Sequence, residues 1–190
     1  MSRLELQIIL TKSAKRTIII VPILLPLTFC WRGAELPHKI WEPACGEGHL
    51  SRRLEELGYK VYSTDLIDRG YGDGGRDFFS IKKENVWNGA ILTNPPYSLA
   101  QEFIEQGLRL VTPGNKVLMF LKLQFLEGKK RRKLFDTGQL KTLYVSTSRI
   151  LCAKNGDFES MKAGGGSAVA YGWYEWEKDY HGDPVIKWIN

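Results

Sequence analysis

The amino-acid sequence predicts an α/β fold built on a seven-stranded, mostly parallel β-sheet with an antiparallel hairpin at one edge. From residue 39 onward, short apolar runs alternate with segments of helical periodicity, which is the pattern of a parallel sheet with crossover helices. The last two apolar runs, 141–146 and 167–176, have no convincing helix between them. Strands joined without a crossover helix pair antiparallel, so these two are expected to form the hairpin.

The first unit of the sheet is a strand, a turn and a helix. Residues 39–41 form the predicted strand and residues 42–48 the turn. In the predicted helix, 49–57, three leucines recur at spacings of four and three residues and therefore share one face. Gly58 is expected to end the helix, because glycine takes the left-handed conformation found after helix C-termini.

Two further strands are predicted before the middle of the chain. Residues 60–64 give a second strand that ends at Asp65. A loop rich in glycine and aspartate follows at 69–76, and a short third strand is expected to enter Asp77 and Phe78. In this fold class, ligands bind at the carboxyl ends of strands, where these polar residues lie.

The centre of the sheet is predicted from two apolar runs. Residues 90–93 form the fourth strand and lead into the tetrapeptide Asn-Pro-Pro-Tyr at 94–97. A helix is expected at 99–110, closed by a Pro-Gly pair. Residues 116–121 form the fifth strand, and their apolar character suits a position in the middle of the sheet.

The length and composition fit one globular domain with a sizeable core. The chain has 190 residues, of which 43% are hydrophobic and 25% charged. We predict an atypical N-terminal segment at 1–36 and a single domain at 37–190.

The net charge of +6 is concentrated in one block, which points to a polyanionic partner. Without the five charges of this block, the net charge would be +1. Contact with phosphates and a solvated surface segment are both open interpretations of the block. It consists of Lys129, Lys130, Arg131, Arg132 and Lys133.

The N-terminal segment contains an apolar run at 18–29. The run is too short for a transmembrane helix, which needs about 20 apolar residues. It is similar to the core of a signal peptide, but Pro22 and Pro26 disfavour a regular helix. A buried extended segment or a poorly structured terminus is the preferred interpretation.

The cysteines indicate a reducing compartment. Cys30, Cys45 and Cys152 are widely spaced and odd in number, so they suggest neither a metal-ligand pair nor a disulfide framework. We therefore expect a cytoplasmic protein with no metal and no membrane partner.

The turn after the first strand has the properties of a nucleotide-type site. Gly46 and Gly48 allow a ligand to approach the backbone closely. Asp65 lies about 20 residues further on, where an acidic side chain can accept hydrogen bonds from ribose hydroxyls. Glu42 and Glu47 would repel phosphates and suit a ligand with a cationic centre or an amino group. S-adenosylmethionine has both.

The tetrapeptide at 94–97 suits a substrate amino group. Two prolines hold the backbone rigidly and leave carbonyls without competing amides. The Asn94 side-chain oxygen and a prolyl carbonyl could accept both hydrogens of an amino group, while its lone pair attacks an electrophilic methyl group. Tyr97 offers a flat face for a base that has been flipped out of a duplex. A simple tight turn is the structural alternative.

The two motifs together resemble those of Rossmann-like adenine-specific DNA methyltransferases, in particular the small phage and prophage forms. The residues that carry the resemblance are Trp-Glu-Pro-Ala-Cys-Gly-Glu-Gly at 41–48 and Thr-Asn-Pro-Pro-Tyr at 93–97, and it extends from about residue 37 to the C-terminus. It implies a Rossmann-like class I methyltransferase fold, S-adenosylmethionine as cofactor, and methylation of the adenine N6 amino group in DNA.

The resemblance also implies roles for individual residues. The turn would hold the methionine part of the cofactor, Asp65 its ribose, and Asp77 with Phe78 its adenine. The implied contacts of the methionine part are Glu42, Pro43, Ala44, Cys45, Gly46 and Gly48, and the implied catalytic residues are Asn94, Pro95, Pro96 and Tyr97. Methyl transfer would be direct, without a covalent enzyme intermediate.

Other activities stay open on the sequence alone. Methyltransferases that act on protein glutamine or on RNA also carry Asn-Pro-Pro-Tyr, although their cofactor turn usually differs from the one here. Amino-cytosine methylation goes more often with serine in place of Asn94. A catalytically impaired DNA-binding remnant is the alternative from another class, because residues 17–31 do not look like the upstream segment that these enzymes usually carry.

Overall fold

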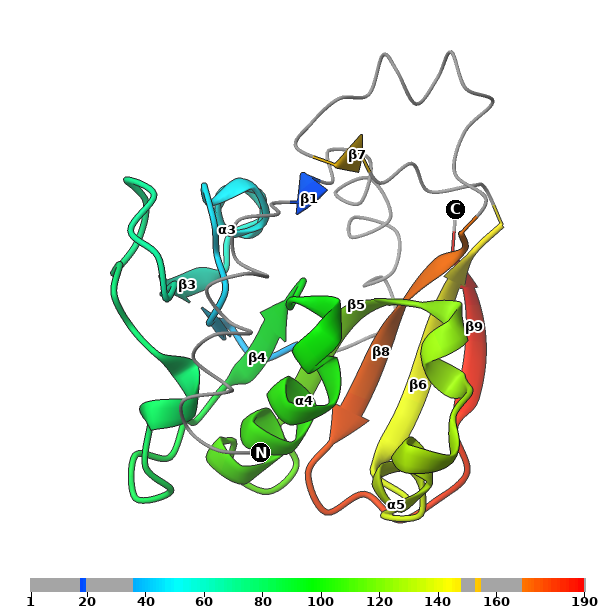
Figure 1. The fold of residues 1–190 in the computed structure, drawn as a ribbon. Coiled ribbons are helices and arrows are strands. Elements are labelled where there is room, and N and C mark those ends of the chain that lie inside the picture. The colour runs from blue at the N-terminus through cyan, green and yellow to red at the C-terminus, as the bar shows by residue number, and fades with distance from the viewer. Residues whose placement is uncertain (1–17, 20–35, 148–152, 155–168, 190) are drawn as a thin grey trace.

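The structure is a computed structural model that describes residues 18–19, 36–147, 153–154 and 169–189 (Figure 1). The apolar run beyond Ile19, Cys30, Cys152 and the predicted start of the last strand lie outside the described residues.

A mixed sheet of seven strands forms the centre of the described part of the chain (Figure 1). Its order is β3-β2-β4-β5-β8-β6-β9. Neighbouring strands are parallel except for the pairs β5–β8 and β6–β8. The strands are β2 (Lys39–Glu42), β3 (Lys60–Ser63), β4 (Ala90–Thr93), β5 (Lys116–Lys122), β6 (Leu140–Ser146), β8 (Tyr171–Glu177) and β9 (Val185–Ile189).

Most of the predicted sheet is confirmed. The first, second, fourth and fifth predicted strands correspond to β2, β3, β4 and β5. The two late apolar runs form β6 and β8, which pair antiparallel as expected. The sheet is therefore the predicted α/β sheet, mostly parallel with one antiparallel strand between β5 and β6.

The predicted third strand does not form. The chain before Asp77 makes only an isolated bridge between Thr64 and Asp73. The 3₁₀-helix η2 (Phe78–Ser80) follows, and the Asp77 carboxylate caps it by accepting from the Phe79 amide. Three glycines between Asp65 and Asp77 have positive φ angles, which strand backbone does not accommodate.

The antiparallel pair lies inside the sheet and not at its edge, because β9 forms the edge instead. Nearly all of β8 is buried, so it is stable only with a neighbour on each side. β9 pairs parallel with β6 and exposes most of its residues, as an edge strand does. The predicted third strand is missing and β9 was not predicted, so the sheet still has seven strands.

Helices cover both faces of the sheet and close two hydrophobic clusters. Helix α3 (His49–Glu56) packs through Leu54 against the face that carries Ile40. Helix α4 (Ala100–Leu110) packs against the other face, which carries Ile91 and Val117, and lies in front of the sheet in Figure 1. Both helices were predicted.

The other described elements are short. After β5 come two 3₁₀-helices and one helical turn, η4 (Leu123–Leu126), η5 (Lys129–Arg131) and α5 (Arg132–Phe135). The two-residue strands β1 (Ile18–Ile19) and β7 (Ala153–Lys154) pair antiparallel. In the part of the chain that the structure describes, no helix combines the length and apolar character needed to cross a bilayer.

Candidate active site

The two sequence motifs meet at one edge of the sheet. β2 lies between β3 and β4 and runs parallel to both, so the carboxyl ends of the three strands point to the same edge. The turn after β2, Asp65 after β3 and Asn94 after β4 therefore lie next to one another. This is the edge at which open α/β sheets bind ligands.

Left-handed glycines shape the turn between β2 and α3. Gly46 and Gly48 have φ angles of 57° and 80°, which other residues rarely adopt. A side chain at Gly48 would collide with the Tyr71 ring, whereas a Cβ atom at Gly46 would meet nothing within 4 Å. Gly46 thus faces open space, where a ligand can approach the backbone. Of the other predicted turn residues, Pro43 is buried and Ala44 packs against the core.

Asp65 fastens this turn to the end of β3. Its carboxylate is buried and accepts hydrogen bonds from two backbone amides, Gly46 at 2.8 Å and Ile67 at 2.8 Å. The Cys45 amide adds a bond of 3.0 Å to the Thr64 carbonyl. In the structure, Asp65 therefore stabilises the turn through hydrogen bonds. Its contact with a ribose stays a prediction.

Glu42 is a buried carboxyl group beside the turn. It accepts a hydrogen bond from the Ser51 hydroxyl on α3, and Ser51 lies 2.7 Å from the Ser63 hydroxyl. Burial raises the pKa of Glu42 from 4.5 to about 8, because the charged form loses its hydration. Sequence reasoning did not identify the two serines, although alternation along β3 places Ser63 on the same face as α3.

This carboxyl group should make the stability of the fold fall as pH rises. Between pH 4.5 and about 8, the folded state holds a proton on Glu42 that the unfolded state has lost. The free energy of unfolding should therefore fall by up to about 1.4 kcal/mol per pH unit in this window. In Glu42→Gln this contribution is absent, so the variant should gain stability over the wild type as pH rises. Urea denaturation from pH 5 to 9 measures the difference, and curves that stay parallel would contradict a buried, protonated Glu42.

Cys45 is buried and chemically inert in this arrangement. Burial raises the pKa of its thiol to about 12, so the sulfur stays protonated at neutral pH. Its thiol donates to the Tyr71 carbonyl over 3.7 Å. Within the described residues, no group of three or more His, Cys, Asp or Glu side chains is placed to hold a metal ion.

Asp77 and Phe78 follow the glycine-rich loop. The Asp77 carboxylate accepts from the Phe79 amide at 2.9 Å, and this bond starts η2. Phe78 is buried, with ring centroids 5.3 Å from Trp41 and 5.1 Å from Phe103. Both residues therefore have contacts that stabilise the fold. Their contact with the adenine of a cofactor stays a prediction.

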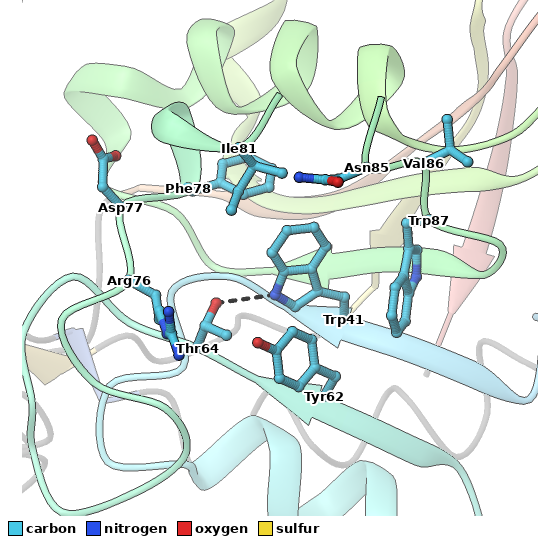
Figure 2. A pocket seen from close by; sticks show the side chains of 10 residues that line it. All are labelled: Trp41, Tyr62, Thr64, Arg76, Asp77, Phe78, Ile81, Asn85, Val86 and Trp87. Atoms are coloured by element: carbon cyan, nitrogen blue, oxygen red, sulfur yellow. Dashed lines mark hydrogen bonds between the residues drawn. The ribbon is translucent and has the colours of Figure 1, made fainter. Parts of the chain in front are cut away.

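An aromatic cavity lies on the α4 face of the sheet, with Asp77 and Phe78 at one end (Figure 2). Its volume is about 470 Å³. Trp41, Tyr62 and Trp87 form one wall, and the indole of Trp41 donates to the Thr64 hydroxyl at 3.0 Å (Figure 2). The remaining lining residues are Arg76, Ile81, Asn85 and Val86.

Sequence reasoning missed this cavity. Its aromatic wall comes from β2, β3 and the segment before β4, three parts of the chain with no shared motif. The available signal was the alternation along β3, which places Tyr62 and Thr64 on the face opposite Ser63.

Asn94 presents an unused acceptor at the end of β4. Its side-chain oxygen Oδ1 is buried and has no hydrogen-bond partner among the described residues. Buried polar atoms are nearly always paired, and an unpaired one costs about 1–3 kcal/mol. The Asn94 oxygen is therefore available to a ligand that supplies the missing donor.

Tyr97 is the last residue of the tetrapeptide and begins a short helix. Pro96 precedes the 3₁₀-helix η3 (Tyr97–Leu99), and the Leu99 amide donates to the Pro96 carbonyl at 2.9 Å. The Tyr97 ring lies 6.0 Å from the Tyr171 ring and has the Lys122 ammonium 5.5 Å above it. Pro95 is buried and Pro96 half-buried.

The basic block divides into structural and solvent-facing cations. Arg131 donates to the Phe125 carbonyl at 3.2 Å and covers the Phe125 ring at 4.5 Å. Arg132 pairs with Asp136 at 2.5 Å. Among the described residues, Lys129, Lys130 and Lys133 form no ion pair, and all three are exposed. Arg131 anchors the segment, while the lysines face solvent.

No protein-family model matches this sequence, and no curated protein matches it either. Solved structures do match. One is a Listeria monocytogenes protein assigned as a class I S-adenosylmethionine-dependent methyltransferase, with 16% identity over 98% of this chain and 72% of that chain, and a TM-score of 0.59. The chain has the class I methyltransferase fold.

Two further solved structures show how far this likeness extends. A Vibrio vulnificus protein assigned as a modification subunit of a type I restriction enzyme is 11% identical over 90% of this chain, with a TM-score of 0.59. This chain spans 47% of the length of that protein. A Lactococcus lactis protein assigned as a hemolysin is 12% identical over 78% of this chain and 83% of that chain, with a TM-score of 0.54. At such identities the likeness shows the fold alone, and function must be argued from the site.

Proposed function

We propose that this chain is an S-adenosylmethionine-dependent methyltransferase that methylates the N6 amino group of adenine in DNA. The observation that carries the proposal is the buried, unpaired oxygen of Asn94, at the end of the strand next to a glycine turn. An amino group is the donor that fits this oxygen. One solved structure with this fold is assigned as a class I S-adenosylmethionine-dependent methyltransferase, and another as a modification subunit of a type I restriction enzyme.

The residues around the turn fit the cofactor. Gly46 leaves open space at its α-carbon, and Glu42 places a polar carboxyl group beside the turn, which carries a proton and no charge at neutral pH. Asp77 and Phe78 border the aromatic cavity, whose flat side chains suit an adenine ring. When bound, S-adenosylmethionine supplies an electrophilic methyl group on a sulfonium.

The tetrapeptide residues would hold the substrate amino group. Asn94 Oδ1 accepts one amino hydrogen, and the Pro95 carbonyl accepts the other. The nitrogen lone pair then points away from both acceptors, and positioning of this kind supplies much of the rate in a bimolecular transfer. The ring of Tyr97 offers a surface for the flipped-out base.

The exposed lysines of the basic block support a nucleic-acid substrate. In the double variant Lys129→Gln/Lys130→Gln, two phosphate contacts should be lost. The slope of log Kd for duplex DNA against log salt concentration should therefore fall by about 2. Lys82→Gln/Lys83→Gln removes another adjacent and exposed lysine pair and should leave the slope unchanged. Fluorescence anisotropy over a salt series measures both, and equal slopes would exclude a contact at the block.

Nucleoside mass spectrometry tests the function directly. Plasmid DNA and total RNA are incubated separately with the full chain and S-adenosylmethionine, with Asn94→Ala as the control. N6-methyladenine in DNA, absent with the variant, is the expected result. Methylated RNA alone would move the substrate to RNA. N4-methylcytosine would move it to the other exocyclic amino group, and the absence of any product would contradict the proposal.

A further inference from the structure

The edge strand β9 exposes large apolar side chains. Trp188, Ile186 and Val185 have 69%, 58% and 53% of their surface exposed. Because side chains alternate along a strand, Ile186 and Trp188 share one face and Val185 lies on the other. Tryptophan is enriched at contact surfaces relative to the rest of a protein's surface.

The strand register places Trp188 at the same edge of the sheet as the proposed active site. One row of paired residues crosses the sheet from β4 to β9 and ends at Ile186. Trp188 lies two residues further along β9, toward the carboxyl ends of the parallel strands. The aligned residues are Thr93, Met119, Tyr174, Leu143 and Ile186. Asn94 directly follows the first of them.

The basic block covers the same face of the sheet. Phe125 and Leu134, which flank it, belong to the hydrophobic cluster of this face together with Leu143. Leu143 is the neighbour of Ile186 in the register, and Val145 that of Trp188. Figure 1 shows residues 123–135 in front of β6, the strand next to β9. Exposed lysines and an exposed indole from distant parts of the sequence therefore lie on one face.

We infer that Ile186 and Trp188 of β9, together with Lys129 and Lys130, form a second DNA-contact surface. This inference rests on the proposed function. It says which side chains contact the DNA on one side of the target base. The lysines contact phosphates, and the Trp188 indole packs against a base or sugar, as apolar side chains do at minor-groove steps. Four strand spacings separate β4 from β9, which is about 19 Å. This is close to the distance spanned by about six base-pair steps, so one duplex reaches both places.

Charge favours DNA over a second copy of the chain as the partner. β9 could also extend its sheet by antiparallel pairing with another β9. The two-fold axis of such a pair would stand perpendicular to the sheet, so both basic blocks would lie on the same face and repel each other. A polyanion instead meets complementary charge.

Affinity for duplex DNA measured in a salt series tests the inference. Trp188→Ala should weaken binding of a 30-base-pair duplex about tenfold, within the range that loss of one stacked contact produces. The salt slope should stay unchanged, because no charge is removed. Trp188→Phe should retain most of the affinity. Val185→Ala, on the same strand but the opposite face, should bind as the wild type does. Thermal unfolding checks that each variant is folded.

The outcomes separate this inference from the proposed function, because binding is measured without methyl transfer. Weaker binding by Trp188→Ala with no N6-methyladenine from the wild type would support the surface and contradict the activity. Full activity and unchanged binding by Trp188→Ala would overturn the surface alone. A wild-type dimer that Trp188→Ala converts to a monomer in sedimentation, with unchanged DNA affinity, would assign the surface to a second copy.

Discussion

Asn94→Ala should reduce the single-turnover rate of N6-methyladenine formation by at least about 100-fold, the effect expected when an acceptor that acts on the reacting group is lost. Binding of S-adenosylmethionine should change little, because Asn94 is proposed to hold the amino group of the base. The free energy of unfolding should stay within about 1 kcal/mol of the wild type, or rise. The Oδ1 atom is buried and has no partner among the described residues, so its removal costs the fold no hydrogen bond.

Two further variants make this result specific. Asn94→Asp keeps an acceptor oxygen and should retain part of the rate, whereas Asn94→Ala keeps none. Asn88→Ala lies near the other end of the same strand, where its side chain accepts from Asn115 at 3.3 Å. It should leave the rate unchanged. A destabilised Asn94→Ala protein with a nearly normal rate would indicate that the residue is structural.

The elements that the sequence predicted are those whose residues carry their own signal. β4 and β5 are mostly apolar and buried in the sheet, β2 has a buried Ile-Trp pair, and α3 and α4 have one apolar face each, so burial and periodicity agree. The order of the motifs along the chain then placed the turn and the tetrapeptide at one edge. These features follow from local sequence, and the structure confirms them.

Features that depend on distant parts of the chain were missed. β9 is short, mostly exposed and without a polar–apolar alternation, so nothing local distinguishes it from a tail. The aromatic cavity and the carboxyl–serine contact of Glu42 each join separate segments. The third strand was predicted wrongly because a turn-rich loop followed by Asp-Phe-Phe looks like a strand entrance, while in the structure Asp77 caps a 3₁₀-helix.

Asp65→Ala should lose both stability and cofactor binding. The Asp65 carboxylate accepts two backbone amides, and hydrogen bonds to charged groups contribute about 1.5–3 kcal/mol each. The Gly46 amide then has no acceptor, and the turn keeps only the backbone bond from Cys45 to Thr64 at the end of β3. We expect a fall of about 2–4 kcal/mol in the free energy of unfolding, within the range for a broken buried network. Titration calorimetry should detect no binding of S-adenosylmethionine.

Asp65→Asn separates the role of Asp65 in stability from its role in cofactor binding, and Asp68→Ala is the control. Asparagine can accept from only one of the two amides, so Asp65→Asn should lose part of the stability. Asp68 accepts from the Gly70 amide at 2.9 Å in an exposed loop, and Asp68→Ala should cost less than about 1 kcal/mol. If Asp65→Asn keeps its stability but does not bind the cofactor, the carboxylate acts mainly on the ligand. If Asp65→Ala is unstable yet binds with wild-type affinity, the bond to Gly46 does not shape the site. Loss of both properties together would mean that the carboxylate builds the site by fixing the glycine turn to the sheet.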